Sequence, residues 1–266
     1  MPELPEVETV VRGLRGPLVG RTFTGITVLW PKAIVAPSVA EIKRRLPGQR
    51  IEAINRRAKY LRFELSEGDT LFLHLKMSGN LLVEPATDPL APHVRTIFDL
   101  DNHYQLRFRD TRKFGRVYLV DDPDIVIGKL GPEPLADDFT ANDFKVLFRN
   151  RKGKLKPLLL NQEFIAGIGN IYADESCFAA GVDPRRQVNT LSDEELGKLY
   201  HAIRQALNHG IMRKGASLDD VYRGGEFQNH FQVYGRTDEN CIQCGAPIQR
   251  VILGGRSTHF CPHCQQ

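Results

Sequence analysis

The segment CIQCGAPIQRVILGGRSTHFCPHC, residues 241–264, decides the fold at the C-terminal end of this chain. Two Cys-x-x-Cys pairs stand sixteen residues apart, and each pair can aim two thiolates at one ion from a tight turn. The four thiolates of Cys241, Cys244, Cys261 and Cys264 complete a tetrahedral site with no open position for a catalytic water. The sequence therefore predicts one structural zinc ion.

Between the two cysteine pairs, strand-like runs flank Gly254-Gly255, which predicts a β-hairpin with a two-residue turn. Arg256 would then lie at the tip of the hairpin, pointing away from the metal. A hairpin this short has little core and needs the metal in order to fold. His259 or His263 could replace one thiolate, and the module could serve only to stabilise the chain end. The exposed tip arginine instead favours a role in binding nucleic acid.

The size and composition of the chain indicate a globular protein of two domains. The chain has 266 residues, 41% of them hydrophobic, and chains of this length commonly form domains of roughly 100–150 residues. No apolar run approaches the ~20 residues that span a bilayer, and the acidic N-terminus lacks the features of a signal peptide. We therefore expect a cytoplasmic monomer with no membrane partner. In a reducing compartment, Cys177 is expected to be a buried thiol.

The positive charge of the chain is concentrated in clusters. The formal net charge is only +4, which by itself indicates no partner. The basic clusters fall at residues 43–45, 56–59, 107–116 and 149–156. Any one of them could be a solvated surface, but four of them together with a zinc module favour a polyanionic partner such as nucleic acid.

The hydrophobic pattern changes along the chain in a way that predicts an α+β protein. Residues 3–15 have helical spacing, and this N-terminal helix should end near Gly16-Pro17. From Thr22 to about Val120, short β-rich runs predict an antiparallel sandwich or barrel, with one helix at Ser38–Leu46. Further helices are expected at 142–148, 157–161, 171–179 and 193–213, the last with Ser192 as its N-cap.

These changes of pattern divide the chain into four segments. The first, residues 1–130, is the β-sandwich domain, and the Pro- and Asp-rich stretch 131–139 is a linker. Residues 140–231 form a helical domain, and residues 232–266 form a zinc finger with four cysteine ligands.

The N-terminal dipeptide Pro2-Glu3 acquires reactivity if the initiator Met is removed. An α-amino group titrates at roughly 7.7–8.0, so a substantial fraction is an unprotonated nucleophile near neutral pH. A secondary amine that attacks an aldehyde-type carbon gives an iminium ion, which is a strong electron sink. Glu3 and Glu6 are close in sequence and could carry protons. A proline at position 2 is by itself weak evidence, so this interpretation depends on the rest of the chain.

Eight motifs, in order along the whole chain, resemble those of the formamidopyrimidine-DNA glycosylase family, bacterial base-excision enzymes that remove oxidised purines. The motifs are MPELPEVETV (1–10), RRAKYL (56–61), HLKMSG (74–79), DTRKFG (110–115), LGPEPL (130–135), AGIGNIYADE (166–175), QVYGR (232–236) and the zinc hairpin. The related endonuclease VIII group, which prefers oxidised pyrimidines, typically has Gly where this chain has Leu4. The resemblance therefore implies purine lesions such as 8-oxoguanine and formamidopyrimidines.

The resemblance implies a bifunctional DNA glycosylase and AP lyase, acting in the bacterial cytoplasm at the nucleoid. Pro2 would attack the sugar C1′ and form a Schiff base, with Glu3 as general acid/base and Glu6 shaping the site. Lys59 would contact phosphate and assist β-elimination. Arg256 would grip the phosphates beside the lesion and assist δ-elimination. The expected product is a one-nucleotide gap with phosphate at both ends.

The resemblance also implies how double-stranded DNA is held. The damaged nucleotide must leave the base stack, at a cost of a few kcal/mol. Met77, Arg112 and Phe114 would fill the hole, because an apolar wedge replaces stacking and a guanidinium can hydrogen-bond the widowed cytosine. The residues expected to hold the DNA are His74, His93, Arg112, Arg151, Lys156, Asn170 and Tyr234.

The family's helix–two-turn–helix element corresponds here to the segment around Asn170. This residue follows Gly167 and Gly169 and opens a helix, whose first backbone amides are a ready anion site. The two glycines are expected to let a DNA phosphate approach closely.

Two other functions compete with this interpretation. The same chemistry could act on oxidised pyrimidines, although Leu4 argues against it. The chain could also be a zinc protein that binds DNA without catalysis, but its intact set of Pro2, Glu3, Lys59 and Arg256 argues against that. Residues 215–232 are several residues shorter than in many relatives, where this region closes over extruded 8-oxoguanine, so the sequence does not rank the lesions.

Overall fold

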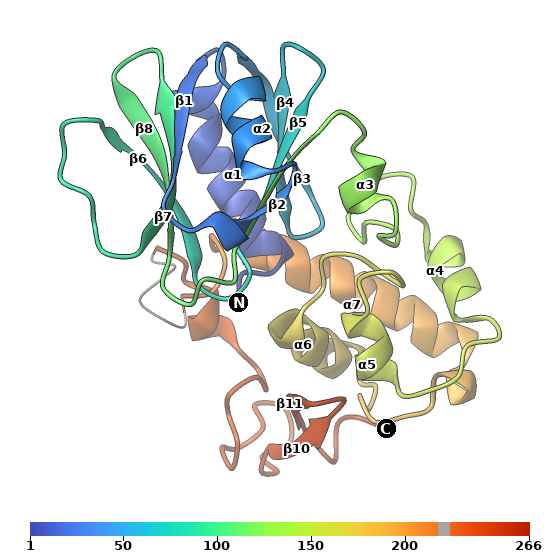
Figure 1. The fold of residues 1–266 in the computed structure, drawn as a ribbon. Coiled ribbons are helices and arrows are strands. Elements are labelled where there is room, and N and C mark those ends of the chain that lie inside the picture. The colour runs from blue at the N-terminus through green and yellow to red at the C-terminus, as the bar shows by residue number, and fades with distance from the viewer. Residues whose placement is uncertain (218–223) are drawn as a thin grey trace. The chain divides into compact units, whose positions relative to one another are not determined.

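The computed structural model describes residues 1–217 and 224–266 (Figure 1). These residues form two compact units. Unit 1 comprises Met1–Pro2, Glu6–Lys129 and Gly224, and unit 2 comprises Glu3–Pro5, Leu130–Ser217 and Gly225–Gln266. Part of the predicted closing loop, residues 218–223, lies outside the described residues. Among the described helices, none is both long enough and apolar enough to cross a membrane.

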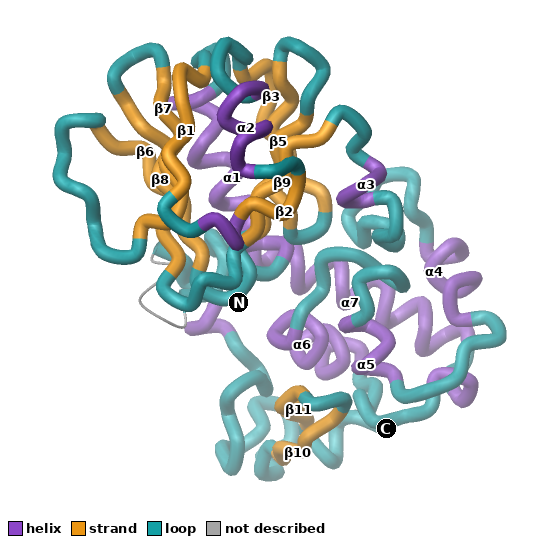
Figure 2. The backbone as a smooth tube through the Cα atoms, in the orientation of Figure 1, coloured by secondary structure: helices purple, strands orange, loops and turns teal. Residues whose placement is uncertain are grey.

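Unit 1 is built on two β-sheets (Figure 2). One sheet has the strand order β1-β7-β8-β6 and is antiparallel; the other has the order β2-β9-β5-β4-β3 and contains one parallel pair, β2 and β9. The elements are α1 (Leu4–Leu18), β1 (Phe23–Val28), η1 (Pro31–Ala33), β2 (Ile34–Ala36), α2 (Val39–Arg45), β3 (Ile51–Arg57), β4 (Tyr60–Leu65), β5 (Thr70–His74), β6 (Gly79–Pro85), β7 (Val94–Leu100), β8 (Tyr104–Asp110), β9 (Arg116–Val120) and α3 (Asp124–Ile127).

Helix α1 supplies the centre of the unit 1 core, although its first two residues belong to unit 2. Val7, Val11, Leu14 and Leu18 recur every three or four residues and therefore lie along one face of the helix. This face is buried against strands of both sheets, and Figure 1 shows α1 between them. The helical spacing of apolar residues in the sequence is therefore explained by the burial of one face of α1.

Unit 1 differs from the sequence-based prediction in the end of α1 and in two strands, and it confirms one predicted helix. Helix α1 includes Pro17 in its last turn and ends at Leu18, whose side chain is fully buried in the core. Strands β2 and β6 were not predicted, and β2 has only three residues, too few for an alternating pattern. The predicted helix at Ser38–Leu46 is confirmed as α2, whose N-cap Ser38 accepts the backbone N–H of Glu41 at 3.2 Å.

Unit 2 is mainly helical. Its elements are α4 (Ala141–Phe148), α5 (Leu155–Leu160), α6 (Asn170–Ala180), η2 (Val188–Thr190), α7 (Asp193–Met212), η3 (Phe227–His230), β10 (Gln249–Leu253) and β11 (Arg256–Phe260). Ser192 and Glu195 form a reciprocal capping box at the start of α7, as the sequence predicted. The predicted starts of the other helices lie within two residues of the observed ones.

The main segment of unit 1 ends at Lys129, and the main segment of unit 2 begins at Leu130. The sequence-based division placed its first domain boundary at residue 130. The helical segment and the zinc hairpin, which received separate ranges from the sequence, fall within one unit. Helix α6 packs against both α7 and β11, which joins them.

His74, the last residue of β5, is buried in unit 1 with 8% of its surface exposed. Its Nδ1 accepts the backbone N–H of Lys76 at 2.9 Å, and its ring packs edge-on to Tyr60 with 4.6 Å between centroids. Burial, reinforced by the positive charges of Lys76, Lys59 and Arg116, lowers the pKa of His74 to about 3. The imidazole is therefore neutral at physiological pH.

This lowered pKa predicts an acid-sensitive contribution to stability. The unfolded chain binds a proton at His74 below pH ~6.5 while the folded chain does not, so the contribution is present above that pH and is lost as the pH falls towards 3. On going from pH ~7.5 to pH ~5, wild type should lose about 2 kcal/mol of unfolding free energy relative to His74→Gln. Urea unfolding at both pH values measures this difference.

The matched control for this prediction is His93→Gln, because His93 is an exposed histidine of the same unit. Its stability difference from wild type should not show the shift expected for His74→Gln. A gap between wild type and His74→Gln that stays constant between the two pH values would contradict the prediction.

Candidate functional site

The carboxylate of Glu3 lies at the N-terminus of α6. The side chain is only 2% exposed, Oε1 accepts the backbone N–H of Ile171 at 3.0 Å, and Oε2 accepts that of Tyr172 at 3.4 Å. The first N–H groups of a helix have no partner within the helix and carry partial positive charge, so a carboxylate is stabilised there. These two hydrogen bonds fix Glu3 in place directly after Pro2 in the chain.

Gly167 and Gly169 make room for the N-terminal segment of the chain. A Cβ at Gly169 would lie 2.2 Å from Cδ of Glu3, and one at Gly167 would lie 2.6 Å from Cδ1 of Leu4. Gly167 also has a φ of +96°, and its carbonyl accepts the Leu4 N–H at 3.1 Å. In this structure the space at the two glycines is used by Glu3 and Leu4, and the approach of a DNA phosphate to this helix start stays a prediction.

Tyr234 is positioned by the buried side chain of Glu175 on α6. The Glu175 carboxylate accepts the consecutive backbone N–H groups of Gln232, Val233 and Tyr234 at 2.9, 3.0 and 2.8 Å. Burial raises the pKa of Glu175, and the three amide donors oppose that rise. Burial raises the pKa of Tyr234, and the Asn170 side chain is close enough to oppose that rise. Two predicted DNA contacts, Asn170 and Tyr234, are thus brought together.

Lys156 and Asp174 form a fully buried ion pair that reaches the zinc hairpin. Nζ of Lys156 lies 2.6 Å from Oδ1 of Asp174 and donates to the carbonyl of Ser257 at 2.6 Å. Oδ2 of Asp174 accepts the backbone N–H of His259 at 3.0 Å. Burial lowers the pKa of Lys156, and Asp174 opposes that change. The prediction that Lys156 contacts a phosphate does not agree with this placement, because its ammonium group is paired inside the protein.

The four predicted zinc ligands are brought together in unit 2. Their Sγ atoms all lie within 4.8 Å of one another, with 3.8 Å between Cys241 and Cys264 and 3.5 Å between Cys244 and Cys261. A tetrahedral ion with Zn–S distances of ~2.3 Å separates its sulfur ligands by about 3.8 Å, so the cluster fits zinc. Among the described residues, no other group of three or more metal-binding side chains was found. The site is one for a single structural zinc.

Arg256 lies at the exposed tip of the zinc hairpin, as the sequence predicted. It pairs with Leu253 across Gly254 and Gly255, whose φ angles of +57° and +73° suit a two-residue hairpin turn. A Cβ at Gly254 would lie 3.2 Å from the ring of Pro157, so the tip rests on α5. The hairpin is therefore fixed at its base by the cysteines and along its length by α5 and α6.

In unit 1, Lys59 lies in the tight turn between β3 and β4. Ala58, the other turn residue, has a φ of +52°, and the flanking residues Arg57 and Tyr60 pair across the hairpin. The Lys59 side chain is only 5% exposed, and its charge contributes to the low pKa of His74. The two predicted phosphate contacts Lys59 and His74 are thus neighbours in this unit.

Asp110 links two loops that carry the predicted intercalating residues. One loop, between β5 and β6, carries Met77, and the other, between β8 and β9, carries Arg112 and Phe114. Oδ1 of Asp110 accepts the Ser78 hydroxyl, and its Oδ2 accepts the backbone N–H of Gly115 at 2.7 Å. The Ser78 hydroxyl in turn accepts the backbone N–H of Arg112 at 3.0 Å. Since Asp110 is 2% exposed, these contacts form a buried joint beneath both loops.

Above this joint the predicted intercalating side chains are accessible. Phe114 is 44% exposed, and the guanidinium group of Arg112 lies 5.2 Å from the centroid of its ring. Met77 is half-buried in the 76–78 turn. His93 is exposed, and its carbonyl accepts the N–H of Asp110 at 2.9 Å. These four predicted DNA contacts therefore belong to one corner of unit 1.

The remaining predicted site residues take separate positions. Glu6 is 3% exposed on α1 of unit 1. Arg151 is exposed on unit 2, with its guanidinium group 5.6 Å from the centroid of the Phe164 ring.

Sequence reasoning missed the residues that position the others, namely Asp110, Asp174 and Glu175. All three occur inside the motifs that carry the resemblance, yet none received a role. The sequence did contain an indication for Asp174 and Glu175. These two adjacent acidic residues interrupt a run of mostly apolar and small residues, NIYADESCFAA. Charged residues are rarely fully buried unless they are paired, so such a pair indicates internal partners.

Three family models match successive parts of the chain. Residues 1–117 match the formamidopyrimidine-DNA glycosylase N-terminal domain, and residues 130–221 match the H2TH domain of the same enzymes. Residues 238–266 match a zinc finger found in FPG and IleRS.

Curated relatives and solved structures match over the full length. Proteins named formamidopyrimidine-DNA glycosylase from Herpetosiphon aurantiacus and Chloroflexus aurantiacus are 45% and 48% identical, covering 100% of this chain and 100% and 98% of theirs. Lactococcus lactis Fpg in complex with abasic-site DNA is 36% identical, with a TM-score of 0.93 and full coverage of both chains. A complex of that protein with N7-benzyl-Fapy-dG DNA has the same TM-score at 38% identity. This chain belongs to the formamidopyrimidine-DNA glycosylase family.

Proposed function

We propose that this chain excises oxidised purines from double-stranded DNA by Schiff-base chemistry at Pro2 and then cleaves the strand by β,δ-elimination. The observation that carries the proposal is the Glu3 carboxylate held on the N-terminus of α6, one residue from Pro2. Membership of the family supplies the class of reaction.

Removal of Met1 would free the Pro2 nitrogen for attack on C1′ of the damaged nucleotide. A bond forms between this nitrogen and C1′ and the nitrogen gives up its proton, while the glycosidic bond breaks and its electron pair leaves with the base, which takes up a proton. Opening of the sugar ring transfers the C1′–O4′ electron pair to O4′, which is protonated, and leaves an iminium ion at C1′. Glu3 suits the role of proton carrier because two backbone donors hold its carboxylate at a fixed position.

The iminium ion acidifies the C2′ proton, and two eliminations follow. Loss of that proton breaks the C3′–O bond, and a second elimination breaks the C5′–O bond, so that each flanking strand end keeps its phosphate. Lys59 would contact phosphate and assist the first step, and Arg256 would grip the flanking phosphates during the second. Cationic donors at both places stabilise the negative charge of the departing phosphates. Glu6, buried on α1, would shape the site.

The remaining predicted contacts would hold the DNA with the lesion extruded. Met77, Arg112 and Phe114 share a buried joint and would fill the vacated stack as a unit. His74, His93, Arg151, Asn170 and Tyr234 would contact the DNA backbone. A neutral His74 whose Nδ1 is occupied would do so by donating from Nε2.

Lys156 is better suited to a positioning role than to phosphate contact. Its ammonium group joins α5, Asp174 of α6 and the carbonyl of Ser257, the residue that follows Arg256. We infer that this pair sets the position of the hairpin tip and so of Arg256.

The preference for purine lesions rests on membership of the Fpg group rather than on a contact made by Leu4. The Leu4 side chain is fully buried and packs against Gly167 in the core of unit 2, so it does not touch the substrate. In this proposal residues 1–130 carry the N-terminal nucleophile and part of the DNA contacts. Residues 131–139 are a linker, residues 140–231 bind DNA, and residues 232–266 form the zinc finger. The protein would act in the bacterial cytoplasm, at the nucleoid.

Borohydride trapping tests the proposed Schiff base. Reduction of the iminium ion should link the protein covalently to a duplex containing 8-oxoguanine opposite cytosine, with a much lower yield on a duplex containing thymine glycol. Denaturing gel electrophoresis measures the yield. No trapping by wild type would refute the mechanism, and a strong preference for thymine glycol would refute the assignment of substrate.

The control for trapping is a chain extended at its N-terminus, in which the Pro2 nitrogen is an amide and cannot attack. This extended chain should give no covalent product while still binding abasic-site DNA. Pro2→Gly is a weaker control, because glycine also offers an α-amine once Met1 is removed.

Substitutions in the buried ion pair test whether Lys156 positions Arg256 or contacts DNA. If Lys156 positions the hairpin, both Lys156→Met and Asp174→Asn should weaken DNA binding and δ-elimination, as Arg256→Ala should. If Lys156 contacts phosphate, Asp174→Asn removes a negative charge and should strengthen binding.

Breaking a buried ion pair by removing one partner commonly costs ~3–5 kcal/mol of stability, so the double variant should be more stable than either single variant. Gel shifts, product analysis and urea unfolding give the three readouts.

Removal of zinc should abolish DNA binding without destroying the nucleophile. The metal closes the base of the hairpin, and the contacts with α5 and α6 are not expected to hold so short an element alone, so Arg256 should lose its fixed position. Gel shifts before chelation, after chelation and after return of zinc measure the effect. Reductive methylation of the N-terminal amine by formaldehyde and cyanoborohydride should proceed equally with and without zinc. Unchanged DNA binding by fully demetallated protein would contradict the prediction.

A further inference from the structure

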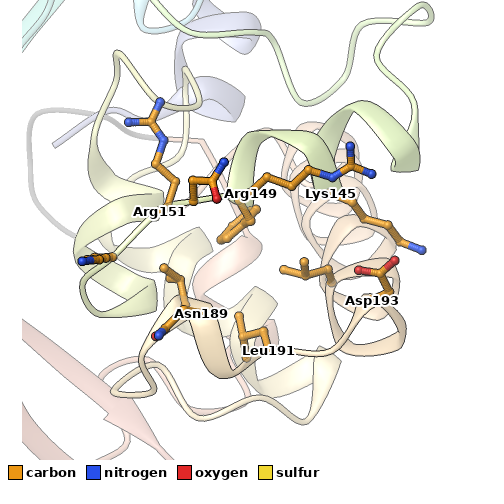
Figure 3. A pocket seen from close by; sticks show the side chains of 11 residues that line it. Lys145, Arg149, Arg151, Asn189, Leu191 and Asp193 are labelled. Carbon is orange, nitrogen blue, oxygen red and sulfur yellow. The ribbon is translucent and has the colours of Figure 1, made fainter.

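A separate cavity lies in unit 2, between the C-terminus of α4, the segment 149–152, η2 and the start of α7. It has a volume of about 420 Å3, within the range of roughly 300–1,000 Å3 that is usual for ligand sites. Figure 3 shows Lys145, Arg149 and Arg151 on one side of the cavity, with Asn189 and Leu191 on the opposite side.

The floor of the cavity is apolar. It is formed by Phe148, Val188 and Leu196, which belong to the core of unit 2, and by the half-buried Leu191. A ligand that reached this floor would bury an apolar group against it, worth about 25 cal/mol for each Å2 removed from water.

The rim of the cavity is strongly positive. Four cations, Lys145, Arg149, Arg151 and Lys152, line it, and Asp193 is its one acidic group. Within the described part of the chain, none of these four cations forms an ion pair with a carboxylate, and Arg149, Arg151 and Lys152 are exposed. The rim therefore offers unneutralised charge to an anionic partner.

We propose that this cavity binds an acidic peptide segment of a partner protein, one that places a large apolar side chain next to a run of carboxylates. The carboxylates meet the cationic rim, and the apolar side chain enters the cavity. A DNA backbone meets only half of this description, because phosphates carry charge but offer no apolar group for the floor. This docking site lies outside the proposed catalytic set, shares only Arg151 with the proposed DNA contacts, and adds a protein partner to the proposed function.

The probe for this proposal is the fluorescein-labelled peptide EDEDELF, and its matched control is EDEDESS, which has the same charge but no apolar end. Fluorescence anisotropy at low salt, ~50 mM, limits the screening of exposed charges. The protein should bind EDEDELF at least about fivefold more tightly than EDEDESS. Equal binding of the two peptides would overturn the proposal, because the rim would then attract charge without using the floor.

Three variants test the position of the site. Arg149→Ser combined with Lys152→Ser should weaken EDEDELF binding by about tenfold, and Asp193→Asn should strengthen it by about twofold. Substituting Lys43 and Arg44 by serine, exposed cations of unit 1, removes the same charge elsewhere and should leave binding unchanged.

The opposite pattern would refute the site. If the Arg149 and Lys152 double variant weakens binding of undamaged duplex DNA and leaves peptide binding unchanged, the rim belongs to a DNA surface. If the Lys43 and Arg44 variant weakens peptide binding as much as the rim variant does, the attraction is non-specific. Borohydride trapping of the same variants reports independently on the proposed enzymatic function.

Discussion

The arrangement of unit 2 depends on the contact between the Glu3 carboxylate and the first backbone amides of α6. It joins residues 168 positions apart in the sequence. The negative charge of the carboxylate is stabilised by the partial positive charge at the N-terminus of α6. The fit is steric as well as electrostatic, because any side chain at Gly169 would collide with Glu3. The chemistry proposed for Pro2 therefore depends on a helix start that a sequence motif would assign to phosphate binding.

Helix α6 extends this organisation from the catalytic dipeptide to the zinc hairpin. Its N-terminus holds Glu3, Asp174 holds Lys156 and the backbone of His259, and Glu175 holds the segment that carries Tyr234. Burying charge is costly, and an apolar replacement of a buried pair is often as stable or more stable. We infer that this pair is kept because its directional contacts give the hairpin one position, where apolar packing would tolerate several.

Much of the fold could be predicted from local signals in the sequence. The Ser192 capping box, the Gly254-Gly255 turn and the two cysteine pairs each specify their structure within a few residues, because the partners are near in sequence. Strand β2 could not be predicted, since its three residues are defined by pairing with β9 and not by a pattern of their own. Asp110 was missed for a similar reason: its partners Ser78 and Gly115 come together only when the two loops meet.

The basic run at residues 149–156 shows why charge in a sequence does not define one surface. Arg149, Arg151 and Lys152 precede α5 and face solvent, whereas Lys156 lies within α5 and turns towards Asp174. The exposed cations lie in the irregular segment before the helix, whereas Lys156 lies on the buried face of α5 with Leu155 and Leu159. The same run thus supplies the rim of a surface cavity and an internal link to Arg256. The acidic partner on α6, distant in sequence, determines which lysine has which role.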